Sequence, residues 1–351
     1  MPELIVTNFN RNFTGVSATA AGVVRAHAGR YDLVLAGHPL PGGPAPASLS
    51  RARMLSTTVP ENRPFVIWHV RRNTEMRAAI WVRDVLRRPV RIVFTSAAIR
   101  RHSALPRWLI SRMDAVIATS EAAASYVPHV QAVVPHGVDT SVFQPAPDRS
   151  AAWAATGFPG TRGIATIGRI RPEKGTDRFV QSMLTLLPAC PDLTALVIGR
   201  AASGDQSFLK GLQAQVAAAG LADRLLFAGE MDATRLAALV PALSAVVQLP
   251  RYEGYGMAPL EGMAAAVPFV ATDQGYYRSF SGQGHCGLIV SEQEAEAAGP
   301  AISALLDDPE RLERMGHRAR DTVRTHFSVS READAIADVY ETLWSDAGRT
   351  G

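Results

Sequence analysis

Short runs of apolar, mostly β-branched residues recur along the whole chain and constrain its fold more than any other feature. They are nearly continuous, and stretches with helical spacing separate them. Strands that are buried on both faces and alternate with helices are typical of parallel sheets in βα order. The runs occupy residues 4–7, 33–36, 65–68, 92–95, 116–119, 130–134, 164–167, 196–198, 225–227, 246–249, 269–271 and 288–290. Six runs in each half predict an α/β protein with two Rossmann-like, doubly wound parallel-sheet domains.

A proline-rich segment, PHGVDTSVFQPAPDRS (135–150), separates the sixth run from the seventh. Because 351 residues also exceed the usual size of a single domain, we predict domains at 1–145 and 146–330. Residues 331–351 should form a C-terminal helix that packs back on the first domain, since Ala335, Ile336, Val339 and Leu343 share one face. Two such domains would face each other across a cleft between the carboxyl ends of their strands, where ligands bind.

The positive charge of the chain is concentrated in the first half. From Arg51 to Arg112 there are fourteen arginines against Glu61, Glu75 and Asp84, although the net charge of the whole chain is only +4. Such a stretch suits an anionic partner: a phosphorylated lipid, an acidic sugar, a membrane surface or nucleic acid. The alternative is a solvated face with scattered arginines.

Other features predict a cytoplasmic protein. No apolar run approaches the 18 or so residues that a membrane-spanning helix needs, and the N-terminus lacks the pattern of a secretory signal. The two cysteines, Cys190 and Cys286, form neither a disulfide framework nor a metal-binding motif.

The segment RYEGYGMAPLEGMAA (251–265) is the most informative motif. It follows an apolar run, contains two loop glycines, and should start a helix near Pro259, with Glu261 in its first turn. A helix N-terminus presents positive potential to anions and to sugar hydroxyl oxygens. Glu253 and Glu261 flank this terminus, and their carboxylates can accept hydrogen bonds from hydroxyl groups. The alternative is that both glutamates only complement the helix dipole. This role accounts for one of the glutamates but not readily for both.

A second motif, GRIRPEKG (168–175), directly follows the run at 164–167. Arg169 and Lys174 would project from the carboxyl end of a strand, just before the next helix. Two cations at this place can hold a diphosphate and stabilise the charge that develops as it leaves. A solvated basic loop is the alternative for this motif taken alone.

Together these motifs resemble the GT-B retaining glycosyltransferases of family 4. The resemblance rests on Arg169, Lys174 and the Glu253/Glu261 pair, with support from VVPHGVDTSVF (133–143) and CGLIV (286–290). It implies that Arg169 and Lys174 bind the donor diphosphate and act in catalysis, and that Glu261 binds the ribose. It also implies that catalytic Glu253 holds the transferred sugar together with the backbone of Gly254, Tyr255, Gly256 and Met257. The nucleobase would lie near Arg200 and Met231.

In the first half, NFTGVSATAAG (12–22) resembles the glycine loop of this family that faces the donor phosphates, with Gly15 as its one glycine before the helix. His69 lies at the end of a predicted strand, where the family often has a histidine near the reacting centre. The resemblance therefore implies donor binding by Gly15 and a catalytic role for His69, whereas a buried structural histidine is the alternative.

More narrowly, WHVRRNTEM (68–76), FTSAAIRRH (94–102) and RWLISRMDAVIATS (107–120) resemble alphaproteobacterial lipopolysaccharide-core mannosyltransferases. The resemblance implies a GDP-mannose donor and an anionic glycolipid acceptor that carries the acidic sugar Kdo. Arg71, Arg72 and Asn73 would then bind the acceptor, and the first domain would be the acceptor domain. We also expect this basic domain to attach peripherally to the inner face of an anionic membrane.

The sequence predicts an enzyme without a metal or another cofactor. It has no D-x-D motif and no histidine spacing suited to metal ligation. GQGHCG (282–287) matches a dinucleotide-binding pattern, but an apolar run follows it where a helix is required. Three alternatives remain open: a transferase with another nucleotide sugar or lipid acceptor, a UDP-sugar 2-epimerase of the same fold, and a nucleic-acid-binding protein. Carboxylates at the predicted sugar site argue against the last of these, because they repel phosphate backbones.

Overall fold

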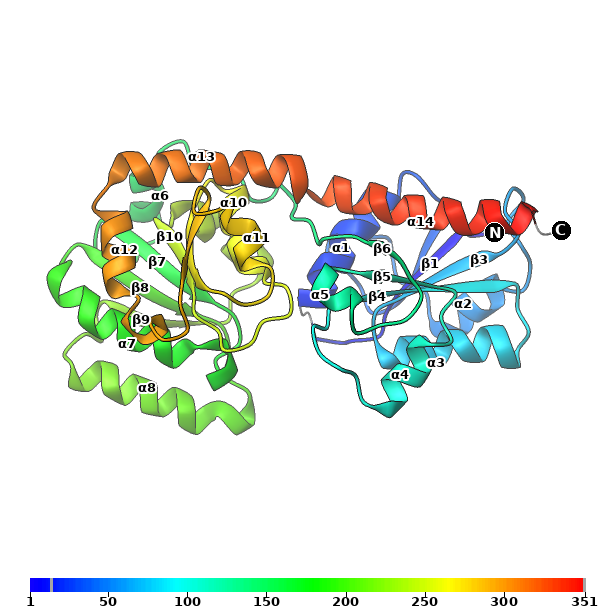
Figure 1. Cartoon of the computed structure of the whole chain (residues 1–351), viewed down its shortest axis with the longest axis horizontal. Helices are drawn as coiled ribbons and strands as arrows, with labels where there is room; N and C mark the ends of the chain where they lie inside the picture. The colour runs from blue at the N-terminus through cyan, green and yellow to red at the C-terminus, as the bar shows by residue number, and fades with distance from the viewer. Residues whose placement is uncertain (13–14, 350–351) are drawn as a thin grey trace. The chain divides into compact units, whose positions relative to one another are not determined.

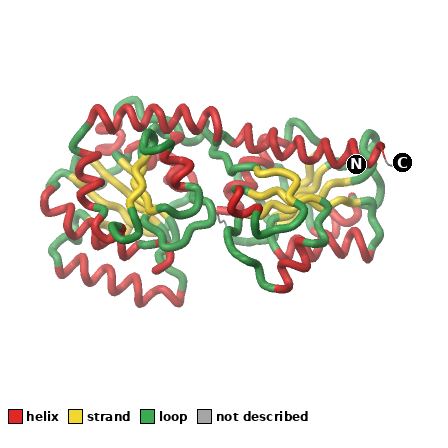
Figure 2. The backbone as a smooth tube through the Cα atoms, viewed as in Figure 1, coloured by secondary structure: helices red, strands yellow, loops and turns green. Residues whose placement is uncertain are grey.

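A computed structural model describes residues 1–12 and 15–349 and divides the chain into two compact units (Figure 1). Unit 1 comprises Met1–Gly137 together with Phe327–Gly351, and unit 2 comprises Val138–His326. Each unit contains one six-stranded sheet, and all the strand pairs within it are parallel. In Figure 2 the strands lie in the middle of each unit, with helices on both sides. The prediction of two doubly wound α/β sheets is therefore confirmed.

The sheet of unit 1 has the strand order β2-β1-β3-β4-β5-β6. Its strands are β1 (Leu4–Asn8), β2 (Leu33–Gly37), β3 (Val66–Val70), β4 (Val90–Ser96), β5 (Ala115–Ala118) and β6 (Val130–Val133). The chain proceeds outward from β1 to β2 and then returns to the other side of β1 for β3. The loops after β1 and β3 therefore run in opposite directions. The carboxyl ends of β1 and β3 form the switch point of this sheet, which is where doubly wound sheets bind ligands.

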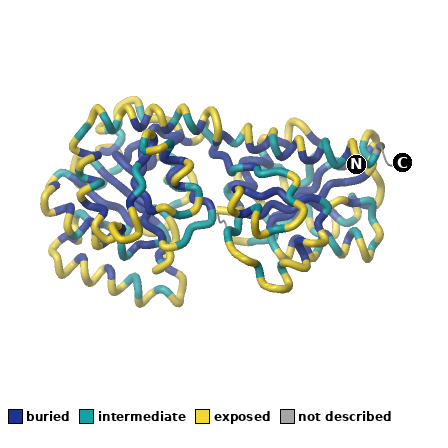
Figure 3. Tube along the Cα trace, in the orientation of Figure 1, coloured by how far each residue is buried: buried dark blue, intermediate teal, exposed yellow. Residues whose placement is uncertain are grey.

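Two hydrophobic layers cover the faces of this sheet. Alternate residues of β3 show the division, because Ile67 belongs to the layer under α1 and α14, and Trp68 to the layer under α2, α3 and α4. The helices of unit 1 are α1 (Gly15–His27), α2 (Leu49–Leu55), α3 (Asn73–Ile80), α4 (Ala104–Ile110), α5 (Glu121–Ala124) and α14 (Val329–Arg349), and a π-helical turn at Trp81–Val85 extends α3. Figure 3 shows the central strands buried, and β1, β3 and β5 are buried along their whole length, whereas the edge strand β6 has no buried residue.

The C-terminal helix α14 is part of unit 1. Its residues Ile336, Val339, Tyr340 and Trp344 are buried in the same hydrophobic layer as α1. At its start Glu332 accepts hydrogen bonds from the Gly137 amide at 2.8 Å and from His136 Nδ1 at 2.7 Å. The chain leaves unit 1 after Gly137 and returns at Phe327, and these hydrogen bonds connect the two segments.

The sheet of unit 2 has the order β12-β11-β10-β7-β8-β9. Its strands are β7 (Arg162–Ile167), β8 (Leu193–Ile198), β9 (Leu225–Gly229), β10 (Ala245–Gln248), β11 (Phe269–Thr272) and β12 (Gly287–Val290). Strands β8 and β9 extend the sheet from one side of β7, and β10 begins the other side. The switch point therefore lies between the carboxyl ends of β7 and β10.

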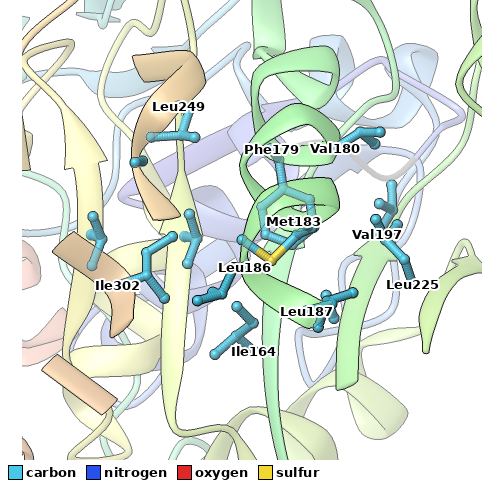
Figure 4. Packing of buried hydrophobic residues seen from close by; sticks show 14 of the residues in the cluster. Ile164, Phe179, Val180, Met183, Leu186, Leu187, Val197, Leu225, Leu249 and Ile302 are labelled. Carbon is cyan, nitrogen blue, oxygen red and sulfur yellow. The ribbon is translucent and has the colours of Figure 1, made fainter. Parts of the chain in front are cut away.

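Eight helices surround this second sheet. They are α6 (Arg149–Ala155), α7 (Thr176–Leu186), α8 (Gln206–Ala218), α9 (Ala233–Leu239), α10 (Met257–Ala264), α11 (Tyr277–Ser281), α12 (Gly299–Leu306) and α13 (Pro309–His326). Figure 4 shows Phe179 and Met183 of α7 packed against Ile164 of the sheet. Close packing on the sheet fixes α7, and with it the loop that joins β7 to this helix.

Helix α10 begins earlier than the sequence predicts. It starts at Met257, so Pro259 is its third residue and Glu261 lies beyond the first turn. The prediction of a start near Pro259 with Glu261 in the first turn is therefore wrong. Proline is tolerated throughout the first turn, where amides lack a partner inside the helix, so its position alone does not fix the first residue.

Candidate functional site

The loops after β7 and β10 of unit 2 are joined at the switch point. The Arg251 amide donates to the Glu173 carbonyl at 2.9 Å, and Arg251 Nη1 donates to the Pro172 carbonyl at 2.7 Å. Gly175 adopts a positive φ of 67°, and a Cβ at this position would lie 1.8 Å from the Leu249 carbonyl oxygen. Only glycine permits this close backbone approach. The two predicted motifs, far apart in sequence, thus form one surface.

Lys174 and Glu253 form an ion pair across these loops. The distance from Lys174 Nζ to Glu253 Oε2 is 2.6 Å, and both side chains are about four-fifths buried. Glu253 also accepts from the Gly254 amide at 2.9 Å and from the hydroxyl of Tyr277. Burial and the charge of Glu253 raise the pKa of Tyr277 well above its ordinary value, so this phenol stays a donor. The structure therefore brings the predicted site residues Lys174 and Glu253 into direct contact.

Arg169 is exposed beside this pair and has no ion pair with any described residue. It shares a small pocket at the carboxyl ends of β7, β8 and β10 with Lys174. The pocket is lined by Thr166, Ile167, Gly168, Arg169, Lys174, Thr176, Val197 and Gln248. Two cations at the mouth of a pocket that lies at a switch point can hold a diphosphate.

Glu261 has an unusual environment on α10. Its carboxylate has no hydrogen bond or ion pair within the described residues, and burial raises its pKa to about 7. Glu261 is half-buried, and a partly desolvated carboxylate without a donor is unfavourable in its ionised form. Hydroxyl groups of a ligand would supply the missing donors, which agrees with the predicted ribose contact.

The loop before α10 offers its backbone rather than its side chains. Tyr255 is buried, and its ring stacks on Tyr276 with 5.1 Å between centroids. Gly256 has a φ of 101°, and a Cβ there would meet the Tyr277 ring at 2.1 Å. The loop is therefore held between aromatic rings. The amides of Gly254, Tyr255, Gly256 and Met257 precede or begin the helix, as predicted from the sequence, although Gly254 already donates to Glu253.

Arg200 and Met231 follow the neighbouring strands β8 and β9. Arg200 lies 3.6 Å from Glu230 in an exposed ion pair, and Met231 is half-buried. Both stand at the carboxyl edge of the same sheet as Arg169 and Lys174. Their contact with a nucleobase stays a prediction.

In unit 1, His69 is completely buried at the end of β3. Its Nδ1 lies 2.5 Å from the Tyr340 hydroxyl and its Nε2 lies 2.7 Å from Thr95 Oγ1. Burial and the nearby charges of Arg71 and His27 hold its pKa well below the ordinary value, so the ring is neutral. Because protein hydroxyls occupy both nitrogens, this geometry favours the structural alternative over the catalytic role.

The neighbouring arginines, predicted as a pair, have different environments. Arg72 donates to Glu75 at 2.9 Å, to Asn8 at 3.1 Å and to Ser17 at 3.0 Å, so it holds the loops after β1 and β3 together. Arg71 is buried, and its Nε and Nη1 atoms have no hydrogen-bond partner in the described structure. Burial lowers its pKa. Of the two arginines, Arg71 is therefore the one with unpartnered hydrogen-bond donors.

Asn73 and Gly15 are the first residues of α3 and α1, respectively, at the same edge of the sheet. Asn73 is exposed. No atom of the described residues lies within 4 Å of a Cβ added at Gly15. Phe13 and Thr14 of the predicted glycine loop lie outside the described residues.

Sequence reasoning missed two carboxylate contacts that organise these sites. Glu75 is fully buried and accepts from Thr7, from the amides of Phe9 and Arg71, and from Arg72. Tyr277, which donates to Glu253, lies 24 positions away in the sequence. The only signal for Glu75 was its position as a rare acid in an arginine-rich stretch, and Tyr277 gave none.

The described residues contain neither a metal-binding cluster nor a membrane-spanning helix. No group of three or more His, Cys, Asp or Glu side chains lies close enough to hold a metal ion. No helix in this part of the chain has the length and apolar character needed to cross a membrane.

Comparison with known proteins agrees with this architecture. Residues 154–322 match the family described as glycosyl transferases group 1. The lipopolysaccharide core biosynthesis mannosyltransferase LpsB of Rhizobium meliloti (strain 1021) is 42% identical over 97% of both chains. The mannosyltransferase LpcC of Rhizobium leguminosarum bv. viciae is 39% identical over 98% of this chain and 97% of its own.

The fold also occurs in a solved structure, Anabaena Alr3699/HepE in complex with UDP and glucose. The TM-score is 0.81 at 16% sequence identity, with 97% of this chain and 100% of that chain covered. A match at this identity supports the fold alone. With the sequence relatives, it shows that this chain belongs to the group 1 glycosyltransferases of the GT-B fold and is a glycosyltransferase. The predicted resemblance to lipopolysaccharide-core mannosyltransferases is confirmed by full-length relatives that carry this name.

Proposed function

We propose that this enzyme transfers mannose from GDP-mannose to an acidic, Kdo-type sugar of a lipopolysaccharide core, with retention and without a metal ion. Support for mannose and for the core acceptor comes from the two rhizobial relatives, which are named lipopolysaccharide core biosynthesis mannosyltransferases and are each matched over nearly their whole length. The observation that carries the donor assignment is the arrangement of Arg169, Lys174 and Glu253 at the switch point of unit 2.

In the proposed donor complex, Arg169 and Lys174 bind the diphosphate. Glu253 and the loop amides before α10 bind hydroxyls of the transferred mannose, and Glu261 binds the ribose. Lys174 lies between the two ligand groups, because its ammonium already contacts the carboxylate assigned to the sugar. A ligand phosphate would give this ammonium a second anionic partner and place the diphosphate next to the sugar. Arg200 and Met231 would contact the base.

The proposed reaction breaks the bond between the anomeric carbon and the diphosphate oxygen as negative charge builds on the leaving group. Arg169 and Lys174 are already placed to stabilise that charge, which is the larger part of such catalysis. The acceptor hydroxyl then attacks from the same face through an oxocarbenium-like state, and a diphosphate oxygen takes its proton. These cations replace the metal of transferases that hold the diphosphate through a D-x-D motif, which this sequence lacks.

Unit 1 is proposed to bind the acceptor and to contact an anionic membrane surface. Arg71 is the best candidate for the carboxylate of the acceptor, since two of its donor atoms have no protein partner. An arginine–carboxylate pair is stronger and more directional than a neutral hydrogen bond. Arg72 supports the site indirectly by fixing Glu75 and the loops around it.

Thermal unfolding with a panel of nucleotide sugars tests the donor. A ligand that binds the folded protein raises its Tm by mass action, so GDP-mannose should give a larger shift than UDP-glucose at equal concentration. A shift with UDP-sugars alone would overturn the donor assignment. Conversion of a UDP-sugar to its 2-epimer without any acceptor would instead establish the epimerase alternative.

A further inference from the structure

One face of unit 1 has exposed apolar side chains among unpaired arginines. Helices α2, α3 and α4 cover one side of the sheet, and their outward sides, with the π-helical turn after α3, form what we call the α2–α4 face (Figure 1). Half of the ten exposed large hydrophobic side chains of the described structure lie on it. They are Met54, Trp81, Val85, Leu105 and Trp108.

Helix α4 shows how the sequence produces this face. Its residues Leu109 and Ile110 are buried against the sheet, whereas Leu105 and Trp108 are 56% and 54% exposed. Leu105 and Trp108 are three positions apart, so they lie on one side of the helix. The helix therefore has one apolar side that packs inward and a second apolar side that the described residues leave exposed. Packing within unit 1 therefore does not explain why apolar residues occupy the outward side of α4.

Trp81, at the end of α3, contacts the neighbouring helix α2. The guanidinium of Arg53 on α2 lies 4.4 Å from the centre of the Trp81 ring, and Trp81 follows directly after α3. Three of the five tryptophans are buried, namely Trp68, Trp153 and Trp344. The two exposed tryptophans are thus both on the α2–α4 face.

The charge of the face is strongly positive. Four arginines of the segments that form this face have no salt bridge in the described structure, namely Arg51, Arg53, Arg77 and Arg107. Three exposed arginines in the adjoining loops, Arg87, Arg100 and Arg101, have none either. Asp84, the exposed acid within these segments, is already paired with Arg83 and Arg112 at 2.7 Å and 3.0 Å. No carboxylate of these segments is therefore left to offset the seven arginines.

We propose that the α2–α4 face docks on an anionic lipid bilayer, with Leu105 and Trp108 entering the interface and the arginines contacting lipid phosphates. Tryptophan favours the boundary between headgroups and acyl chains, and basic residues around an apolar centre are attracted to anionic lipids. A nucleic acid would use the arginines but not Leu105 or Val85. The inference rests on the proposed peripheral attachment and assigns that attachment to a particular face.

The test uses the whole protein and vesicles made of equal parts phosphatidylcholine and phosphatidylglycerol. Co-sedimentation should be strong at low salt and should fall as salt rises. L105S/W108S should weaken it about tenfold, because both side chains lose burial in the interface. R100Q/R101Q/R107Q should weaken it at least as much at low salt, whereas R314Q/R324Q/R331Q, which removes the same charge elsewhere, should change it little.

Quenching by brominated phosphatidylcholine in the same vesicles distinguishes insertion from adsorption. Because Trp81 and Trp108 are the exposed tryptophans, the quenched fraction of emission should come from them and should fall in W108F and in W81F. Wild-type protein that binds neither anionic nor neutral vesicles would overturn peripheral attachment itself. Equal loss of binding in the two arginine triples, or binding without quenching, would overturn only the docking face. Unchanged thermal shift with GDP-mannose in all variants shows that the fold and the donor site are intact.

Discussion

The ion pair between Lys174 and Glu253 is the contact on which the donor site depends. The carboxylate of Glu253 accepts from a cation, an amide and a phenol, so its position is fixed on three sides. A site held in this way needs little rearrangement when it binds a ligand, and such preorganisation favours catalysis. The ammonium of Lys174 is paired with a carboxylate, whereas the guanidinium of Arg169 has no ion pair with any described residue.

Removal of either cation should lower turnover. We expect Lys174→Ala and Arg169→Ala each to reduce kcat by roughly 10²–10³, as is typical for loss of one charge-stabilising donor. Arg171→Ala is the matched control, because Arg171 lies in the same loop, contacts Glu173 at 3.6 Å and does not line the pocket. Steady-state kinetics with the three variants decide the matter. Activity within threefold of wild type for both pocket variants would mean that the diphosphate binds elsewhere.

Glu261 should make nucleotide binding depend on pH. Its pKa of about 7 is raised by burial, and ligand hydroxyls would bind its ionised form. The affinity for GDP should therefore increase as the pH rises from about 6 to about 8, and Glu261→Gln should remove this increase. Isothermal titration at the two pH values measures it. Glu261→Ala should weaken binding, and an unchanged Kd would contradict the ribose assignment.

The same carboxyl group should affect stability in the opposite direction. Because its folded pKa lies above the unfolded value of 4.5, its contribution to folding is complete below about pH 4.5 and is lost as the pH rises through 7. The loss is about 3 kcal/mol at most. Glu261→Gln should therefore be more stable than wild type at alkaline pH in urea unfolding. A variant that is less stable there would show that a partner already holds the ionised form.

Arg71 and Arg72 should separate acceptor binding from folding. Arg71→Ala should raise the acceptor KM and leave donor affinity unchanged, because it removes the buried guanidinium whose Nε and Nη1 have no protein partner in the described structure. Arg72→Ala should lower the Tm, since it removes the hydrogen bonds to Asn8, Glu75 and Ser17 and with them the cation paired with the buried Glu75. Kinetics and thermal unfolding of both variants give the comparison. A larger loss of Tm in Arg71→Ala would reverse the two roles.

At the scale of elements, helix α14 fixes the interior of unit 1 through polar contacts as well as packing. The Tyr340 hydroxyl contacts His69, and its ring packs edge-on against His27 and Tyr31. The helix start carries Glu332, which holds the His136–Gly137 segment. The C-terminal helix therefore contributes to the carboxyl edge of a sheet whose last strand, β6, ends at Val133, far before the helix begins at Val329.

Tyr340→Phe should destabilise the protein by about 1–3 kcal/mol, because it leaves a buried ring nitrogen of His69 without its partner. Donor affinity should not change, since Tyr340 belongs to unit 1 and the donor residues belong to unit 2. Tyr126→Phe is the matched control, as Tyr126 is 44% exposed. Urea unfolding measures both. Equal stability of the two variants would exclude a structural role for this hydrogen bond.

The strands and the site differ in how far the sequence predicts them. All twelve runs became strands, because a strand buried on both faces must be apolar throughout. Arg169, Lys174 and Glu253 could also be predicted, since each follows a strand at the same edge of one sheet. Contacts such as Tyr277 to Glu253 could not be predicted, because they depend on how loops fold over that edge. Nor could the sequence predict that Arg71 is buried with unpartnered donors while Arg72 is hydrogen-bonded, because this depends on the direction in which each side chain points in the folded loop.

At the scale of the whole molecule, donor chemistry and acceptor chemistry are assigned to different units. Arg169, Lys174 and Glu253 lie at the switch point of one sheet, and the acceptor arginines lie at the switch point of the other. The same topology used twice thus provides two ligand-binding edges in one chain. Loss of function at one edge should leave binding at the other intact, which is why the variants above are measured separately for donor and acceptor.

Transfer of radiolabelled mannose from GDP-mannose to a Kdo-terminated lipid tests the central proposal most directly. We predict transfer by the wild type that persists in EDTA, falls in the Lys174→Ala and Arg169→Ala variants, and is much weaker with a neutral-sugar acceptor. Transfer from UDP-glucose but not from GDP-mannose would contradict the donor assignment. Equal transfer to the neutral acceptor would contradict the assignment of Arg71 to an acidic sugar, and loss of activity in EDTA would contradict the metal-independent mechanism.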